Sequence, residues 1–225
     1  MKKFNIFIAC DTTKISKINR IINATKKSDF NLGYKFGLEF INSVNGRKYI
    51  SKLKKKIVFL DLKLNDIPNT VSATMDAIKD LNINYVTVHV SSGLNALKAC
   101  KKNAGKTKVI GVTILTSLDN NLIKQIGYNK KIKNLVAHQA RLAKKAGLDG
   151  LVCSPHEVAI VRKYFKKEII TPGIRLNGKS DDQKRIMTPK QAFDKGSDWI
   201  VIGRSITKGN IIKNFKELTY HLRQI

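Results

Sequence analysis

Acidic and basic side chains alternate within one short stretch of the sequence, where Asp61, Lys63 and Asp66 are spaced as D-x-K-x-x-D. Two further charged residues, Asp11 and Lys35, stand in or just after short apolar runs nearer the start of the chain. Ammonium and carboxylate groups that pair with one another stay ionised at neutral pH, because each favours the charged form of its partner. A cluster of this kind can act on a bound substrate through its fixed charges, so these residues are the first candidates for an active site.

The elements that must position these charges are short apolar runs rich in β-forming residues, which recur eight times along the chain. The predicted strands span residues 4–10, 32–37, 56–63, 85–90, 108–114, 150–154, 168–173 and 199–203. Strands that alternate with helical segments predict a parallel sheet built from βαβ units. Eight such units in 225 residues predict one domain, a (β/α)8 TIM barrel of the α/β class over residues 1–225.

Apolar residues at helical spacing fill the segments between these strands. The predicted helices span residues 15–27, 71–81, 94–102, 133–147, 156–167, 188–196 and 210–224. The region 38–54 is expected to form one broken helix or two short ones, and residues 118–127 an additional short helix. A doubly wound open sheet is the alternative fold, and it is disfavoured because no G-x-G-x-x-G follows the first strand.

Side-chain alternation along the predicted strands brings the charged residues to one end of the barrel. Asp11 ends the first strand, Lys35 lies in the second, and Asp61 and Lys63 lie in the third, in phase with one another. Asp66 follows in the next loop. Barrel active sites lie at the carboxyl ends of the strands, so three adjacent strands would aim charges of alternating sign into one mouth. A purely structural ion-pair network is the alternative, and the clustering at this end favours a function.

The third strand and its continuation read FLDLKLNDIPNT, in which D-x-K-x-x-D is followed by I-P-N-T at 67–70. This stretch resembles the orotidine 5′-phosphate decarboxylase family. Further matching motifs lie at 35–39, 87–93, 111–118, 147–157, 170–175, 185–192 and 196–207. Gln183, between the segments 170–175 and 185–192, also matches. The resemblance covers nearly the whole chain in the family's order, and the motifs are specific as a set.

The resemblance implies the reaction and the roles of the charged network. The expected reaction is decarboxylation of orotidine 5′-monophosphate to UMP and CO2, the last step of UMP synthesis, with no cofactor and no metal. Lys63 matches the family's proton donor, Asp61 the carboxylate beside the substrate carboxylate, and Lys35 the lysine that links the network to the ribose. An ammonium group held against C6 would stabilise the developing carbanion and then protonate it.

The resemblance also implies a homodimer with shared active sites, because Asp66 and Thr70 match residues that family members lend to the neighbouring subunit. The other implied substrate contacts are Asp11, Lys35 and Thr70 for the ribose, Thr116 and Ser117 for the pyrimidine, and Arg175, Gln183, Gly203 and Arg204 for the phosphate. The loop 175–183 resembles the lid that closes over the phosphate. His89 is expected to be a hydrogen-bonded residue of the barrel rather than a base or a metal ligand.

Two alternatives remain, a different enzyme on the same barrel and a protein of another function class. A related barrel enzyme could bind Mg2+ and act on a sugar phosphate. Such enzymes tend to carry Glu at the position that Lys35 occupies in this chain, which disfavours this alternative. A nucleic-acid-binding protein is suggested by the net charge of +27, with 43 basic and 16 acidic residues. The excess consists of 35 Lys and only 8 Arg, scattered along the chain, which does not favour specific nucleic-acid recognition.

Other composition features exclude several classes of protein. Three scattered cysteines do not predict a disulfide framework or a zinc site, and no apolar run is long enough for a membrane helix. A cytoplasmic enzyme is therefore expected. Lysine doublets at 26–27, 101–102, 144–145 and 166–167 coincide with predicted helix C-termini, where the helix dipole favours cations. Much of the excess positive charge is therefore expected away from the active site, on the opposite face of the barrel.

Overall fold

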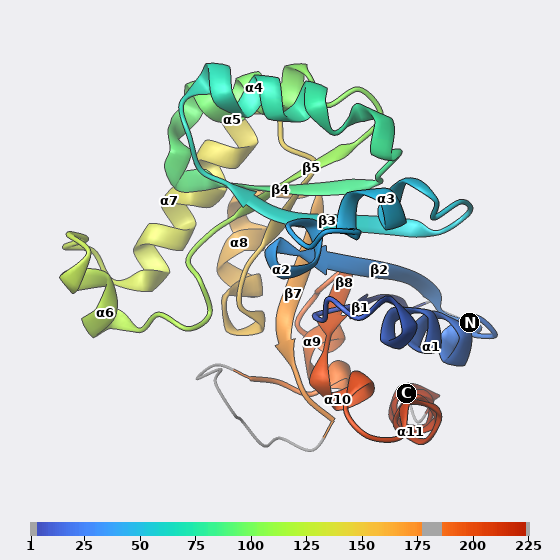
Figure 1. Ribbon diagram of the computed structural model, residues 1–225. Coiled ribbons are helices and arrows are strands. Elements are labelled where there is room, and N and C mark those ends of the chain that lie inside the picture. The colour runs from blue at the N-terminus through green and yellow to red at the C-terminus, as the bar shows by residue number, and fades with distance from the viewer. Residues whose placement is uncertain (1–3, 177–185, 224–225) are drawn as a thin grey trace.

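Eight parallel strands form a closed barrel in the computed structural model, which describes residues 4–176 and 186–223 (Figure 1). The strands are β1 (Asn5–Ala9), β2 (Asn31–Gly37), β3 (Ile57–Leu64), β4 (Tyr85–His89), β5 (Lys108–Val112), β6 (Gly150–Val152), β7 (Glu168–Ile174) and β8 (Trp199–Ile202). Each strand pairs with its neighbours in sequence, and β8 closes the barrel on β1. The predicted (β/α)8 fold is confirmed, and each strand overlaps its predicted range.

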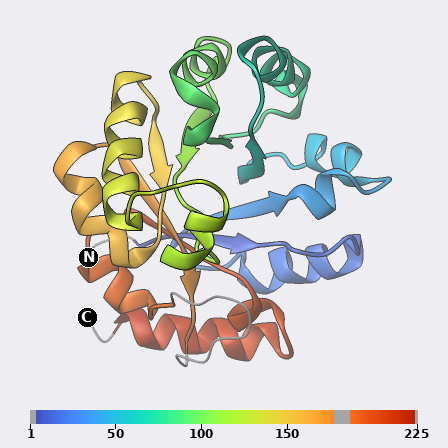
Figure 2. The ribbon, with the colours of Figure 1, turned by 90° about the vertical axis from the view of Figure 1, so that its left-hand side faces the viewer.

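Helices surround the barrel on its outside (Figures 1 and 2). They are α1 (Ile15–Thr25), α2 (Leu38–Ile41), α3 (Gly46–Ser51), α4 (Pro68–Ala77), α5 (Gly93–Lys102), α6 (Asn120–Gln125), α7 (Ile132–Lys145), α8 (Val158–Tyr164), α9 (Pro189–Asp194), α10 (Arg204–Thr207) and α11 (Ile211–Arg223). The expected pair of short helices after β2 and the additional helix α6 are both present. Three short 3-10 turns lie at Lys79–Leu81, Val90–Ser92 and Pro155–Glu157.

One predicted helix needs correction, and one short helix was not predicted. The helix after β3 was expected at 71–81, but α4 begins at Pro68 and ends at Ala77. Proline is well placed in the first turn of a helix, where its missing N–H has no partner to lose. The four-residue helix α10 was not predicted at all, because a segment of that length shows no measurable helical periodicity.

Two apolar cores hold the barrel together. The larger lies between the outer face of the sheet and the helices, and it includes Cys10, Cys100 and Cys153, all three buried and none in a disulfide. The smaller fills the inside of the barrel and is largely aromatic. In it the rings of Phe7 and Trp199 stack with centroids 4.1 Å apart, and Phe59 packs 4.8 Å from Phe7. This aromatic layer closes the interior below the charged residues, which come later along the same strands.

The parallel register explains why the charges reach one level of the barrel. Ala9 pairs with Lys35, and Gly37 pairs with Asp61, so the ends of β1, β2 and β3 lie side by side. Just below them, Gly33 leaves room for the Phe7 ring, since a Cβ at Gly33 would lie 2.5 Å from a ring carbon of Phe7. The aromatic layer therefore depends on a missing side chain on β2.

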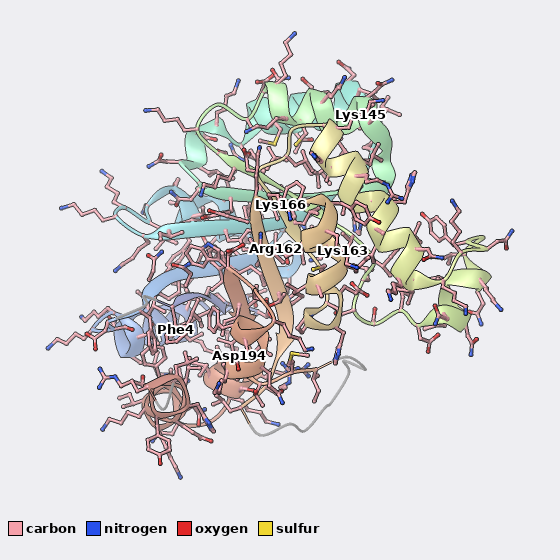
Figure 3. The ribbon with its side chains drawn as sticks, turned by 180° about the vertical axis from the view of Figure 1, so that it is seen from behind. Phe4, Lys145, Arg162, Lys163, Lys166 and Asp194 are labelled. Atoms are coloured by element: carbon pink, nitrogen blue, oxygen red, sulfur yellow. The ribbon has the colours of Figure 1, made fainter. Side chains whose placement is uncertain are left out.

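Two of the four lysine doublets lie in the last turn of a helix, as expected, whereas the doublet 26–27 follows the end of α1. Lys101 and Lys102 fill the last turn of α5, and Lys144 and Lys145 fill that of α7. Figure 3 shows Lys145 at the end of α7 and labels Lys166 as well, which lies beyond the end of α8 rather than within it. The next residue, Lys167, donates from Nζ to the backbone carbonyls of Gly147 and Leu148 just after α7, so it offsets the negative end of that helix.

Four other cations do not follow this expectation. Lys14, Lys17, Arg20 and Lys208 line a surface cleft between the start of α1 and the end of α10. These helices follow the carboxyl ends of β1 and β8, so this part of the positive charge lies on the side of the barrel mouth. These four residues are therefore not among the charges expected on the opposite face.

Within the described ranges 4–176 and 186–223, no helix is both long and apolar enough to cross a membrane.

Replacing Gly33 tests the packing inside the barrel. We expect Gly33→Ala to destabilise the fold by about 1–3 kcal/mol, because the new methyl group overlaps the Phe7 ring in a filled core. Urea unfolding followed by circular dichroism measures this change. Gly37→Ala on the same strand is the control, since its Cβ would have no atom nearer than 3.6 Å. Equal stabilities of the two variants would contradict the proposed packing.

Candidate active site

Four charged side chains meet at the carboxyl ends of β1, β2 and β3. The Lys35 Nζ lies 3.2 Å from Asp11 Oδ1 and 3.3 Å from Asp61 Oδ2. The Lys63 Nζ lies 2.8 Å from the same Asp61 Oδ2. The predicted gathering of Asp11, Lys35, Asp61 and Lys63 is therefore present in the structure, with Asp61 at its centre.

Burial and pairing act in opposite directions on the central carboxylate. Burial alone would raise the pKa of Asp61, but the ammonium groups of Lys35 and Lys63, with hydrogen bonds from Lys63 and Thr87, bring that pKa below its ordinary value. Burial likewise opposes the charged form of Lys35, while Asp61 and Asp11 together hold its pKa above the ordinary value. Both groups are thus ionised at neutral pH.

Thr87 on β4 is a member of this cluster that the sequence analysis did not single out. Its side chain is completely buried, and its hydroxyl donates to Asp61 Oδ1 at 2.9 Å. The same hydroxyl oxygen accepts from the backbone N–H of Lys63 at 2.8 Å. A sequence signal was present, because alternation along β4 turns Thr87 inward with Tyr85, and a polar side chain inside a barrel needs a partner.

The backbone at Lys63 departs from regular strand geometry. The pairing of β3 with β4 passes from Leu60 opposite Val86 to Leu64 opposite Val88, so three residues of β3 lie against Thr87 alone. At this bulge Lys63 has φ of +50°, in the left-handed region. A non-glycine residue in that region costs about 1–3 kcal/mol and persists only where surrounding contacts hold it. Bulges of this kind redirect side chains near active sites.

The network forms one wall of a cavity of about 240 Å³ at the mouth of the barrel. Its predicted members among the lining residues are Asp11, Lys35, Asp61, Lys63, Thr116, Arg175, Gly203 and Arg204. Apolar side chains, among them Ile114 and Val152, complete the lining. The cavity therefore joins an acid–base cluster on β1–β3 to two guanidinium groups after β7 and β8.

Four predicted site residues are not part of this lining. Asp66 is exposed in the loop after β3, where its Oδ1 accepts a hydrogen bond of 2.7 Å from the backbone N–H of Ile67. Thr70 in α4 and Ser117 in the loop after β5 are also exposed and lie outside the cavity. Gln183 and most of the expected lid 175–183 lie outside the described residues, which end at 176 and resume at 186.

His89, the last residue of β4, is half-buried close to the network. Burial, together with the positive charge of Lys63, lowers its pKa, while Asp61 has a smaller opposite effect. The imidazole is therefore neutral at neutral pH and adds no charge to the site. Among the residues that the structure describes, no three His, Cys, Asp or Glu side chains are grouped in a way that could hold a metal ion.

Comparison with known proteins identifies the family. The sequence profile described as "Orotidine 5'-phosphate decarboxylase / HUMPS family" matches residues 5–211. The chain belongs to this family. It is 43% identical over 219 residues to the orotidine 5'-phosphate decarboxylase of Wolbachia sp. subsp. Brugia malayi, covering 95% of this chain and 96% of the relative. It is 47% identical over 182 residues to the same enzyme of Wolbachia pipientis subsp. Culex pipiens, covering 78% and 80% of the two chains.

The family is also evident in three dimensions. The crystal structure of orotidine 5'-phosphate decarboxylase from Lactobacillus acidophilus superposes with a TM-score of 0.82 at 30% identity, covering 97% of this chain and 98% of that one. Membership of the orotidine 5'-phosphate decarboxylase / HUMPS family confirms the resemblance found in the D-x-K-x-x-D motif and the barrel predicted around it.

Replacing Lys35 tests the electrostatics of the site. We expect Lys35→Met to raise the pKa of Asp61, because Lys35 is the strongest of the interactions that favour its ionised form. In the native protein Asp61 is protonated only below its ordinary pKa of 3.8, so the variant should take up this proton at higher pH. The Asp61 contribution to stability, present above 3.8 and lost as pH falls through the lowered pKa, should shrink accordingly.

Carboxyl-carbon NMR of aspartate-labelled protein follows this titration directly. Lys17→Met is the control, because it removes the same charge from a partly exposed position on α1, away from the active-site cavity. An unchanged Asp61 titration in Lys35→Met would show that the Lys35–Asp61 contact is not significant in solution.

Proposed function

We propose that this chain decarboxylates orotidine 5′-monophosphate to UMP and CO2, the last step of pyrimidine nucleotide synthesis, in the cytoplasm and without a cofactor. The observation that carries the proposal is the Lys63 ammonium, which lines the cavity and lies 2.8 Å from the buried carboxylate of Asp61. Relatives that share 41–47% of their residues with this chain are named for this reaction. The arrangement supports a reaction in which charge develops on a substrate carbon and a proton is then delivered to it.

In the proposed mechanism the bond between C6 and the carboxylate carbon breaks, and its electron pair remains on C6 as CO2 leaves. The Lys63 ammonium stabilises this developing negative charge and transfers one proton to C6, becoming a neutral amine that regains a proton from solvent. Asp61 pairs with the Lys63 ammonium at 2.8 Å before the reaction and stands next to the departing carboxylate. In the complex, the Asp61 carboxylate and the carboxylate of the substrate repel each other, and loss of CO2 relieves that repulsion.

The far side of the cavity suits the phosphate of the nucleotide. Arg175 and Arg204 line it together with Gly203, the residue that precedes α10 at the end of β8. Guanidinium groups bind phosphate through paired hydrogen bonds, and barrels frequently hold phosphate after the seventh and eighth strands. We assign these three residues and Gln183 to the phosphate, Asp11, Lys35 and Thr70 to the ribose, and Thr116 and Ser117 to the pyrimidine.

A metal-dependent enzyme of the same family is the nearest alternative, and Lys35 disfavours it. Its ammonium group lies within 3.3 Å of both Asp11 and Asp61, where it already supplies a positive charge between these carboxylates. A divalent cation bound by the same carboxylates would be repelled by Lys35.

We further propose a homodimer in which Asp66 and Thr70 complete the active site of the partner. Both residues are exposed and outside their own cavity. Next to Asp66, Ile67 has 65% of its surface exposed, and Leu38, the first residue of α2 directly after the neighbouring strand β2, has 50% exposed. Large exposed apolar side chains at one end of a barrel are typical of an interaction surface. A two-fold contact there would exchange the same loops between the subunits.

Turnover of orotidine 5′-monophosphate, followed as the loss of its ultraviolet absorbance, tests the reaction. We expect activity that EDTA does not change, and a loss of kcat on the order of 10⁴-fold or more in Lys63→Ala, because that variant lacks the proposed proton donor. Binding of UMP should persist in this variant and shows that it is folded. Turnover of a sugar phosphate that depends on a metal ion, with none of the nucleotide, would support the alternative enzyme instead.

Mixing two inactive variants tests the shared site. In a dimer of Lys63→Ala with Asp66→Ala, one site lacks both residues and the other has both intact. Random exchange of subunits in an equal mixture should therefore restore about a quarter of the wild-type activity. Activity is measured before and after the subunits are allowed to exchange. If Asp66 acts within its own subunit, every site in the mixture lacks one residue, and no activity returns.

A further inference from the structure

Thr87 stands where two parts of the network meet, although it does not line the cavity. Its hydroxyl makes two hydrogen bonds whose directions are fixed by chemistry. The backbone N–H of Lys63 can only donate, so the Thr87 oxygen accepts it at 2.8 Å. The ionised carboxylate of Asp61 can only accept, so the hydroxyl proton points to Asp61 Oδ1 at 2.9 Å. The completely buried hydroxyl of Thr87 thus accepts from Lys63 and donates to Asp61.

The first bond replaces a missing contact of the sheet. Since Leu60 pairs with Val86 and Leu64 with Val88, the segment 61–63 bulges away from the regular ladder opposite Thr87. The Lys63 N–H bonds to the Thr87 side chain in the place of a backbone carbonyl. This bond fixes the residue that carries the ammonium group in its left-handed conformation, with φ of +50°. A side chain of β4 thus holds the backbone of β3 in the shape that aims Lys63 at the cavity.

The second bond fixes the orientation of the Asp61 carboxylate. Oδ1 is occupied by Thr87, and Oδ2 receives both Lys63 at 2.8 Å and Lys35 at 3.3 Å. Without the hydroxyl, Oδ1 would lose this hydrogen bond in a buried setting, and the carboxylate could rotate to share its oxygens differently between the two ammonium groups. The tip of Lys63 would then lose the partner that defines its position.

We propose that Thr87 is a positioning residue that holds Lys63 at both ends, its backbone directly and its ammonium group through Asp61. This inference deepens the proposed decarboxylation and rests on it where activity is measured. Thr87 touches no substrate in this arrangement, so its loss affects the chemical step through the geometry of Lys63 and leaves nucleotide binding through the phosphate and ribose intact.

Thr87→Val is the decisive variant, because valine has nearly the same shape and lacks the hydroxyl. We expect kcat to fall on the order of 10–100-fold with KM and the affinity for UMP within about threefold of wild type. Thr87→Ser keeps the hydroxyl and should retain kcat within about threefold. Thr171→Val is the matched control: Thr171 is also completely buried in a strand, but its hydroxyl bonds to Ser197 and the backbone of Trp199, away from the network.

A readout independent of turnover separates this proposal from the proposed function. The hydrogen bond from Thr87 contributes to the low pKa of Asp61, so Thr87→Val should raise that pKa in a carboxyl-carbon NMR titration, while Thr171→Val should not. If wild type does not convert orotidine 5′-monophosphate, the reaction is wrong, and the titration still tests the role of Thr87.

Three results would overturn the proposal. One is a folded Thr87→Val variant with wild-type kcat and an unchanged Asp61 titration. A second is a fall in kcat matched by an equal fall in Thr171→Val, which would indicate a general effect of lost buried hydroxyls. The third applies when Thr87→Val does not fold. In that case a loss of kcat beyond tenfold in a folded Thr87→Ser variant would show that the hydroxyl is not what positions Lys63.

Discussion

The structure of this active site depends on one constraint, the burial of the Asp61 carboxylate. Only 8% of this residue is exposed, and an isolated carboxylate in such a place would take up a proton rather than remain charged. Two ammonium groups and one hydroxyl reverse that preference and keep the pKa below the ordinary value. Removing one of the two ammonium groups would leave the buried charge only partly compensated, which costs more than a lost surface ion pair. A charged Asp61 therefore requires Lys35, Lys63 and Thr87 to be in place together.

The closed barrel is what makes complete assembly feasible. The partners of Asp61 come from β2, β3 and β4, and the parallel register brings the ends of these strands to one level. Below them the packed rings of Phe7, Phe59 and Trp199 fill the barrel interior and keep water from entering from the opposite end. The aromatic layer and the charged layer are thus two consequences of the same alternation of side chains, one apolar at the amino ends of the strands and one charged at their carboxyl ends.

The parts of this arrangement that follow local rules could be predicted from the sequence. Period-two alternation and the position at the ends of strands were sufficient to bring Asp11, Lys35, Asp61 and Lys63 together. The same alternation could have marked Thr87 as an inward polar residue, but not its bond to the Lys63 backbone, because that bond depends on a bulge in the pairing of β3 with β4, two strands distant in sequence. The start of α4 at Pro68 was missed for a local reason, since periodicity alone does not mark a proline-led first turn.

The cations behind the net charge of +27 have different roles on the outside of the barrel and in the cavity. On the outside, Lys167 and the doublets ending α5 and α7 are placed favourably by helix C-termini, so they need no anionic partner molecule. In the cavity, four cationic side chains and two carboxylates line the wall among the described residues. This local excess of positive charge complements a nucleotide that carries both a phosphate and a carboxylate. The recognition of an anion therefore follows from a few side chains held at fixed positions, and the many lysines outside contribute to it only through the overall field of the protein.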